Sequence, residues 1–117
     1  MFLIYSREHP SEVTAEEFEQ LRAGHRVVHD ETKKLGIFER AQRLKPPRTA
    51  TTLRMENGKP LVLDGPFAET KEQLAGYYIL DCENLDEAIE WAKKIPTACK
   101  VGEGCVEIRP IAEIPSR

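Results

Sequence analysis

The fold is decided around residues 61–72, which read LVLDGPFAETKE. The apolar run that opens this stretch predicts a strand that ends at Asp64, whose carboxylate would then stand at the edge of a sheet. Gly65 and Pro66 turn the chain, because glycine tolerates dihedral angles that other residues avoid and proline fixes φ. A wide loop is the simpler alternative interpretation, since Asp, Gly and Pro are all common turn residues.

A hairpin is predicted immediately before this turn. Asn57 and Gly58 both accept the positive φ of a type I′ turn, and this dipeptide is a strong hairpin signal. Residues 49–54 are rich in β-branched side chains and are typical of a strand. We therefore expect them to pair antiparallel with residues 59–63, which lead into Asp64.

Downstream of the turn, Thr70 and Gln73 have the spacing of a capping box, which indicates a short helical turn. Residues 77–82 read YYILDC and predict a strand, and residues 105–108 predict the last strand. Residues 37–44 are ambiguous, because they fit either a short strand or an extended link.

Two amphipathic helices are predicted. The first begins at a capping box that starts with Thr14 and ends before Gly36, and the second lies between Asn84 and Pro96. Apolar residues recur on both at three- and four-residue spacing, which defines an inward face. These residues are Phe18, Leu21, Val28 and Leu35 around His25 on the first helix, and Leu85, Ala88, Ile89, Ala92 and Ile95 on the second, with Trp91 at the flank as a packing residue.

With a first strand at residues 2–5, the element order is β-α-β-β-β-α-β. This order predicts an α+β fold of the ferredoxin-like split βαβ kind with an added strand, in which two helices cover one face of a five-stranded antiparallel sheet. Residues 2–5, 61–63 and 77–80 are continuously apolar, however, and such strands are usually covered on both faces. We therefore expect the uncovered face to meet the same face of a second copy, as a homodimer.

Three segments carry a family resemblance. Residues 64–80 read DGPFAETKEQLAGYYIL, residues 84–96 read NLDEAIEWAKKIP, and residues 106–111 read VEIRPI. Together they resemble the DGPF proteins of the YCII-related family, and the likeness covers nearly the whole chain, from Phe2 to Ile111. The resemblance implies a ferredoxin-like α+β domain that pairs as a dimeric α+β barrel and carries a His/Asp active site, but it names no reaction.

The composition predicts one soluble globular domain over residues 1–117. Apolar residues make up 40% of the chain and charged residues 32%, which excludes a disordered chain. The 17 basic and 20 acidic side chains leave a net charge of −3 without any basic block, so no nucleic-acid partner is expected. No apolar run approaches the ~20 residues that span a bilayer, so no membrane association is expected either.

Cys82, Cys99 and Cys105 are odd in number and form no CxxC pair. They predict reduced thiols and a cytoplasmic location, with a Cys99–Cys105 disulfide as the less favoured alternative. The chain has no P-loop, no dinucleotide-binding glycine pattern and no Ser/His/Asp order, so no cofactor is expected.

His25 and Asp64 form the candidate catalytic pair. A lone histidine on an apolar helical face is often only a core residue, but Asp64 has a separate reason to be exposed at a turn. If the first helix packs beneath the end of that strand, the carboxylate can hold one imidazole nitrogen and leave the other as an acid or base. His25 also aligns with a histidine in the same helix of many relatives that the chain resembles.

The same site is predicted to bind a small polar or anionic ligand. Its candidate ligand-binding residues are Tyr5, Arg54, Gly65, Pro66 and Phe67. An arginine at the end of a strand can hold a carboxylate or phosphate, although a surface ion pair is the simpler interpretation for Arg54 and for Arg109.

His29 lies four residues after His25, which is the spacing of helical metal pairs. Without an obvious third ligand, no metal is expected, and a solvated His29 near Asp30 is the simpler prediction. His9, in a connection, carries no signal.

These observations favour a small-molecule enzyme that uses His25 and Asp64 for proton transfer. Isomerase or lyase chemistry is the class suggested by analogy with other dimeric ferredoxin-like enzymes. The alternative is a non-catalytic ligand-binding or regulatory module, because some similar proteins occur alongside sigma-factor regulators.

Overall fold

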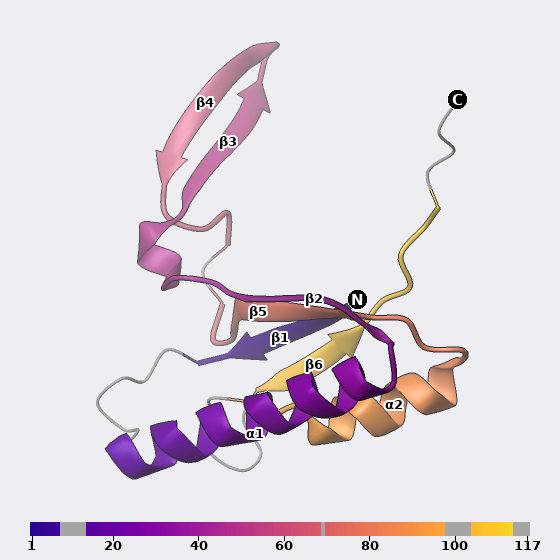
Figure 1. Ribbon diagram of the computed structural model, residues 1–117. Coiled ribbons are helices and arrows are strands. Elements are labelled where there is room, and N and C mark those ends of the chain that lie inside the picture. The colour runs from indigo at the N-terminus through magenta and orange to yellow at the C-terminus, as the bar shows by residue number, and fades with distance from the viewer. Residues whose placement is uncertain (8–13, 69, 98–103, 114–117) are drawn as a thin grey trace.

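The computed structural model describes residues 1–7, 14–68, 70–97 and 104–113, which form an α+β fold (Figure 1). Its elements in chain order are β1 (Phe2–Ser6), α1 (Ala15–Lys34), β2 (Phe38–Arg43), the 3₁₀ turn η1 (Pro47–Thr49), β3 (Thr51–Glu56), β4 (Lys59–Asp64), β5 (Gln73–Leu80), α2 (Leu85–Lys94) and β6 (Cys105–Ile108). Strands β2, β5, β1 and β6 form an antiparallel sheet in that order. Both helices lie on one face of this sheet, as predicted (Figure 1).

The prediction of one five-stranded sheet is wrong. Within the described part of the chain, β3 and β4 pair only with each other and stand apart from the sheet as a hairpin (Figure 1), which we call the arm (residues 51–64). The ambiguous segment 37–44 instead contains β2, the strand that pairs with β5 at the edge of the sheet. Its sequence FERAQR is polar, as is common for an edge strand, which has one side open to solvent. The alternating apolar pattern that identifies a strand in the sequence is therefore weak in this segment.

The tight turn of the arm is confirmed. Asn57 and Gly58 have φ angles of 51° and 78°, the two positive values that a type I′ turn requires. Strand β4 ends at Asp64, as predicted, and the register places Asp64 opposite Thr51 at the base of the arm. Gly65 then turns the chain with a φ of 94°.

The helical turn predicted at Thr70 does not form. Gln73 is the first residue of β5, and its side-chain amide donates to the backbone carbonyls of Ala68 and Thr70, at 3.2 and 3.1 Å. The glutamine that was expected to cap a helix therefore closes the loop before β5.

Both helices begin where their caps predict. The Thr14 hydroxyl accepts the Glu17 N–H at 3.1 Å, and the Asn84 side chain accepts the Glu87 N–H at 2.9 Å. Gly36 follows α1 with a φ of 74°, a left-handed conformation that glycine adopts readily after a helix. Capping depends on residues within one turn, which is why local sequence predicts it.

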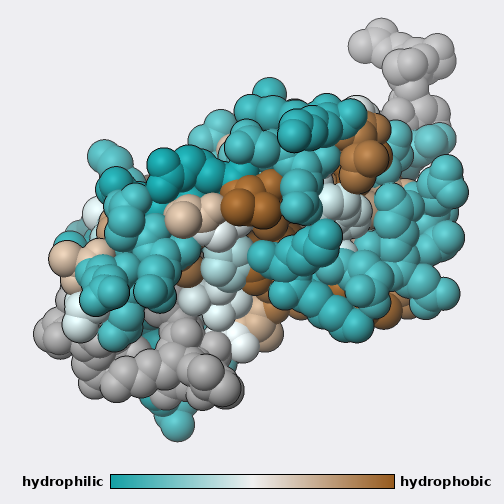
Figure 2. Space-filling model, turned by 60° about the horizontal axis from the view of Figure 1, so that its bottom comes forward, coloured by the Kyte–Doolittle hydropathy of each residue, from teal (hydrophilic) through white to brown (hydrophobic). Residues whose placement is uncertain are grey.

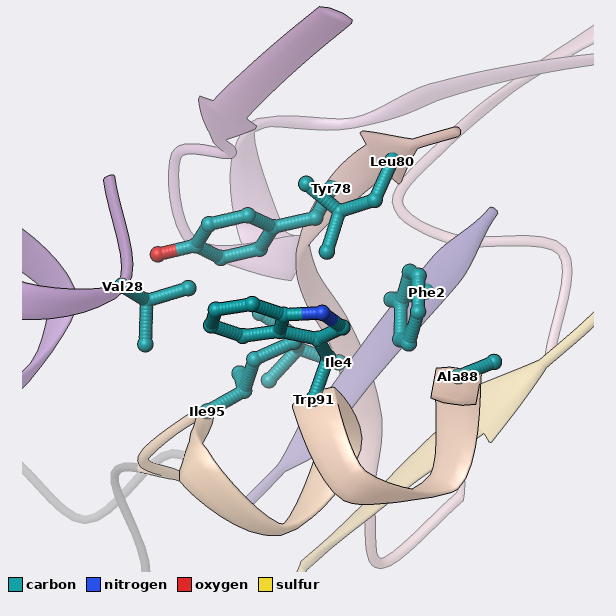
Figure 3. Close-up of a cluster of buried hydrophobic side chains, with 8 residues drawn as sticks. All are labelled: Phe2, Ile4, Val28, Tyr78, Leu80, Ala88, Trp91 and Ile95. Carbon is teal, nitrogen blue, oxygen red and sulfur yellow. The ribbon is translucent and has the colours of Figure 1, made fainter. Parts of the chain in front are cut away.

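The core lies between the helices and the sheet (Figure 3). Its buried members are Phe2, Ile4, Val28, Tyr78, Leu80, Ala88, Trp91 and Ile95. The predicted inward residues Ala88 and Ile95 of α2 are buried, and Trp91, predicted to pack at the flank of that face, is only 7% exposed. Leu85, the first residue of α2, is 62% exposed, so the buried face lies closer to Trp91 than predicted. Burying the large apolar surface of an indole gains more than burying a leucine. Leu35, predicted on the inward face of α1, is also exposed, at the end of that helix.

The outer surface of the helix layer is largely polar, with apolar areas set among the polar side chains (Figure 2). The other face of the sheet has no helix over it in the described part of the chain (Figure 1). We call it the open face; it carries Leu3 and Tyr5 of β1 with Tyr77 and Ile79 of β5, which alternate with the buried residues of the same strands. Among the described segments, no helix has the length and apolar character needed to cross a membrane.

Candidate functional site

His25 lies where α1 runs along the edge strand β2, and we call this line of contact the seam. Residues of α1 at three- and four-residue spacing, which lie on one helical face, line it together with two residues of β2. They are Phe18, Arg22, His25, His29 and Lys33 of α1, and Phe38 and Arg43 of β2. The two elements run in opposite directions, because Arg43 lies over the Phe18 ring at one end and Lys33 over the Phe38 ring at the other.

Tyr78 holds His25 in place. The imidazole Nδ1 lies 2.7 Å from the Tyr78 phenol oxygen, and the two rings are stacked at 5.8 Å between centroids. Tyr78 comes from β5, an inner strand of the sheet, and is 2% exposed, and its hydroxyl points toward α1 beside Val28 (Figure 3). A buried phenol needs a hydrogen-bond partner, which His25 supplies.

His29 belongs to the same cluster. Its ring meets Tyr78 edge-on at 5.3 Å and lies 5.0 Å from the ring of Phe38. His29 lies near Asp30, as predicted, but it is only partly solvated, because its ring packs against two aromatic rings. In the described part of the chain, no group of three His, Cys, Asp or Glu side chains could hold a metal ion.

The environment of the cluster favours the uncharged form of both histidines. Burial lowers the pKa of His25, and the positive charges of His29 and Arg43 lower it further. Burial and Lys33 lower the pKa of His29 as well, while Asp30 opposes them. Burial raises the pKa of Tyr78 to about 12, so the phenol keeps its proton.

When the imidazole of His25 is neutral, its hydrogen bond with the protonated Tyr78 phenol can form in two ways. The phenol can donate to Nδ1, which leaves a proton on Nε2 of His25. In the other tautomer Nδ1 donates to the phenol oxygen of Tyr78, and Nε2 has a free lone pair. In this second form Nε2 is a base whose ring orientation is set by a residue of the core.

Two guanidinium groups stand at one end of the seam. Arg22 and Arg43 lie over the ring of Phe18, at 4.9 and 5.3 Å from its centroid. Among the described residues, neither forms an ion pair with an acidic side chain. This end of the seam is therefore positively charged, and Arg43 already acts on His25 through its charge.

The predicted ligand-binding residues Arg54, Gly65 and Phe67 lie together at the base of the arm. The Arg54 guanidinium donates to the Phe67 carbonyl at 3.3 Å, and the Thr52 hydroxyl donates to the Gly65 carbonyl at 2.7 Å. The Gly65 N–H donates to the carbonyl of Ala50, also at 2.7 Å. These bonds fix the turn around Pro66 onto the arm, and Phe67 itself is exposed.

The structure does not bring the predicted site residues together within one chain. Asp64 is exposed at the base of the arm, and no interaction joins it to His25 among the described residues. Tyr5 lies on the open face, opposite Cys105 of β6. Arg109 is paired with Glu107 at 2.7 Å, which confirms the simpler interpretation of that arginine.

Two of the remaining predictions lie outside the described residues. His9 is one of them, and the proposed Cys99–Cys105 disulfide is the other, because it depends on Cys99. Cys82 is a free thiol, and the Sγ of Cys105 lies 3.7 Å from a carboxylate oxygen of Glu72.

Sequence reasoning missed Tyr78, Arg22 and Arg43. Tyr78 lies in a continuous apolar run, where a tyrosine is normally interpreted as a core residue. The sequence therefore gives no reason to expect a role for its hydroxyl. Arg22 could have been found, because it continues the four-residue spacing from Phe18 toward His25 on one helical face. Arg43 could not, since its place beside Phe18 depends on which strand forms the sheet edge.

Comparison with known proteins places these features in a family. The family model described as YCII-related domain matches residues 1–115. An uncharacterised protein of Rhizobium meliloti (strain 1021) is 48% identical over 79 residues. That match spans 63% of the chain and 63% of the relative's own length.

Proposed function

The chain belongs to the YCII-related family, and from that premise we propose that it is a small-molecule enzyme in which His25 transfers a proton. The observation that carries the proposal is the 2.7 Å contact between His25 Nδ1 and the Tyr78 phenol oxygen. An imidazole that is half-buried, whose pKa is lowered by that burial, and that is held by a fixed partner has the properties of a general base.

In the proposed reaction, Nε2 of His25 removes a proton from the ligand. The ring becomes cationic at that moment, and its Nδ1–H then donates to the Tyr78 oxygen. Hydrogen bonds from a charged donor are about twice as strong as neutral ones, so this contact stabilises the charged ring more than the neutral one. Tyr78 thus acts as a positioning residue, the role that the sequence first suggested for Asp64.

The proposed ligand is a small organic anion, most simply a carboxylate. Arg22 and Arg43 at the end of the seam offer two guanidinium groups without an acidic partner among the described residues. Guanidinium groups bind carboxylates with two parallel hydrogen bonds. The proton is removed from the carbon next to the ligand's carboxylate. The reaction is that of an isomerase if a proton is returned to a different carbon, and that of a lyase if a group leaves from the neighbouring carbon.

The alternative is a non-catalytic ligand-binding or regulatory module linked to sigma-factor signalling. The observation that favours it is the separation of His25 from Asp64, which leaves the histidine without a carboxylate partner among the described residues. Such a module would bind the same anion at the seam without changing it.

Hydrogen exchange separates the two proposals. The protein is incubated in deuterated water with a panel of small carboxylic acids that carry an acidic C–H, and proton NMR follows the loss of that signal. We expect exchange in the wild type, a loss of at least about 100-fold in His25→Gln, and a smaller loss in Tyr78→Phe. Tyr77→Phe, on the open face, is the matched control. Binding of these acids without exchange would favour the regulatory module.

A further inference from the structure

His29 has no part in the proton transfer proposed above, although it shares the surroundings of His25. Its ring meets Tyr78 edge-on at 5.3 Å, and the ring of His25 stacks on the same phenol at 5.8 Å. The backbone carbonyl of His29 accepts the Thr32 hydroxyl at 3.2 Å, but no hydrogen bond among the described residues occupies the two ring nitrogens. This imidazole is therefore placed beside the candidate base with both nitrogens available to a ligand.

The order of residues along α1 determines what a bound ligand meets. His25 follows Arg22 by three residues and His29 follows it by seven, which puts them about 4.5 and roughly 10.5 Å further along the helix axis. All three residues line the seam. A carboxylate held by Arg22 and Arg43 fixes one end of the ligand. If the carbon chain follows the seam, the carbon next to the carboxylate lies beside His25 and a later carbon lies beside His29.

Both histidines belong to one helical face, so they reach such a ligand from the same side. Inversion of a stereocentre needs an acid and a base on opposite sides of one carbon. Removal and return of a proton on one side of a carbon chain instead move the proton along that chain. The arrangement therefore favours migration of a double bond over racemisation.

The neighbouring charges decide which ring takes the first proton. Burial is the largest cause that lowers the pKa of both histidines, and the charge of His29 then lowers the pKa of His25, because neighbouring cations repel. Such a pair takes up its two protons in separate steps. Arg43 also repels a proton on His25, whereas on His29 the repulsion from Lys33 is opposed by Asp30. The first proton therefore goes to His29 and leaves His25 as the base.

We propose that His29 is the acid that completes the reaction of His25, and that the substrate is a small unsaturated carboxylic acid whose double bond shifts by one carbon. This inference rests on the proton transfer proposed above. Nε2 of His25 takes a proton from the carbon next to the carboxylate, and the electron pair of that C–H bond forms the new double bond. The electron pair of the old double bond takes a proton from His29 at the far carbon. His25 ends protonated and His29 neutral, and exchange with water restores both.

Proton NMR of vinylacetic acid and its alkyl derivatives in deuterated water, at about pH 6, tests the proposal. Loss of the C–H signal next to the carboxylate reports on His25. Formation of the conjugated acid with deuterium at its far carbon reports on His29. We expect both in the wild type, and a ratio of isomer to exchange that falls at least about 100-fold in His29→Gln and in His29→Phe, which keeps a ring against Phe38 and Tyr78. Val27→Gln, at an exposed position of α1 outside the seam, is the matched control.

The ratio of the two signals does not depend on how much of a variant is folded, so a destabilised variant still gives an answer. A wild type that shows neither signal with any of these acids would overturn both this inference and the proposed function. Exchange without the conjugated acid in the wild type would overturn the role of His29 and leave that of His25. An unchanged ratio in the two His29 variants would do the same.

Discussion

Nδ1 of His25 lies 2.7 Å from the phenol oxygen of Tyr78, so a helix residue of the seam is tied directly to the core of the sheet. This contact joins two residues that are 53 positions apart in the chain. Any change in the fold that moves β5 relative to α1 therefore alters the histidine on which the proposed chemistry depends.

Tyr78→Phe should lower the pKa of His25 further. The phenol oxygen accepts from the charged ring more strongly than it interacts with the neutral ring, so removing it disfavours the charged form. NMR titration of the His25 ring protons measures the change. Tyr77→Phe, which removes the neighbouring hydroxyl on the open face, should leave the titration as it is, and equal curves for wild type and Tyr78→Phe would contradict the contact.

Acid should destabilise the protein through its histidines. Folding lowers the pKa of His25 and His29 below the ordinary value of about 6.5, so the unfolded chain binds more protons in that range. The free energy of unfolding is then fully retained above about pH 6.5 and falls as the pH drops from there toward the folded-state pKa values.

Urea denaturation at pH 7.5 and pH 5.5, at one protein concentration, measures this loss. His25→Gln removes one of the two groups, so the variant should lose less stability between these pH values than the wild type. Identical losses would show that His25 is not the group that resists protonation. Holding the concentration fixed matters because association also contributes to stability.

Gly58→Val should destabilise the arm. Gly58 has a φ of 78°, and a β-branched residue in this left-handed region costs roughly 1–2 kcal/mol. Gly58→Asn is the matched control, because asparagine tolerates a positive φ. Chemical denaturation measures the difference, and equal stability of the two variants would mean that the turn relaxes without cost.

Local signals in the sequence predicted the fold well where a few neighbouring residues decide the outcome. The caps at Thr14 and Asn84 and the turn at Asn57 and Gly58 are of this kind. Each depends on hydrogen bonds or dihedral angles within about one turn of chain, so no distant partner can change it.

Strand pairing and the candidate site depend on distant residues, and there the sequence was a weaker guide. Strand β2 has a polar sequence but pairs with β5, whereas the more apolar β4 leaves the sheet for the arm. The predicted partner of His25 was Asp64, because the sequence places its carboxylate at a turn that follows a strand. The partner observed is Tyr78, a core residue whose single hydroxyl carries no sequence pattern.

The predicted pair of His25 and Asp64 can still be tested in the assembled protein. Within one chain Asp64 is not among the charges that act on His25, so only the Asp64 of a second copy could form this pair. A carboxylate near His25 favours the charged ring. If the homodimer predicted from the sequence makes this contact, Asp64→Asn should lower the pKa of His25 at protein concentrations where the dimer forms, and should have no effect where the protein is monomeric. NMR titration at both concentrations measures this, with Asp30→Asn as a control that should change the pKa of His29. If Asp64→Asn leaves the His25 titration unchanged in a folded dimer, the two residues do not interact, and Tyr78 alone positions the histidine.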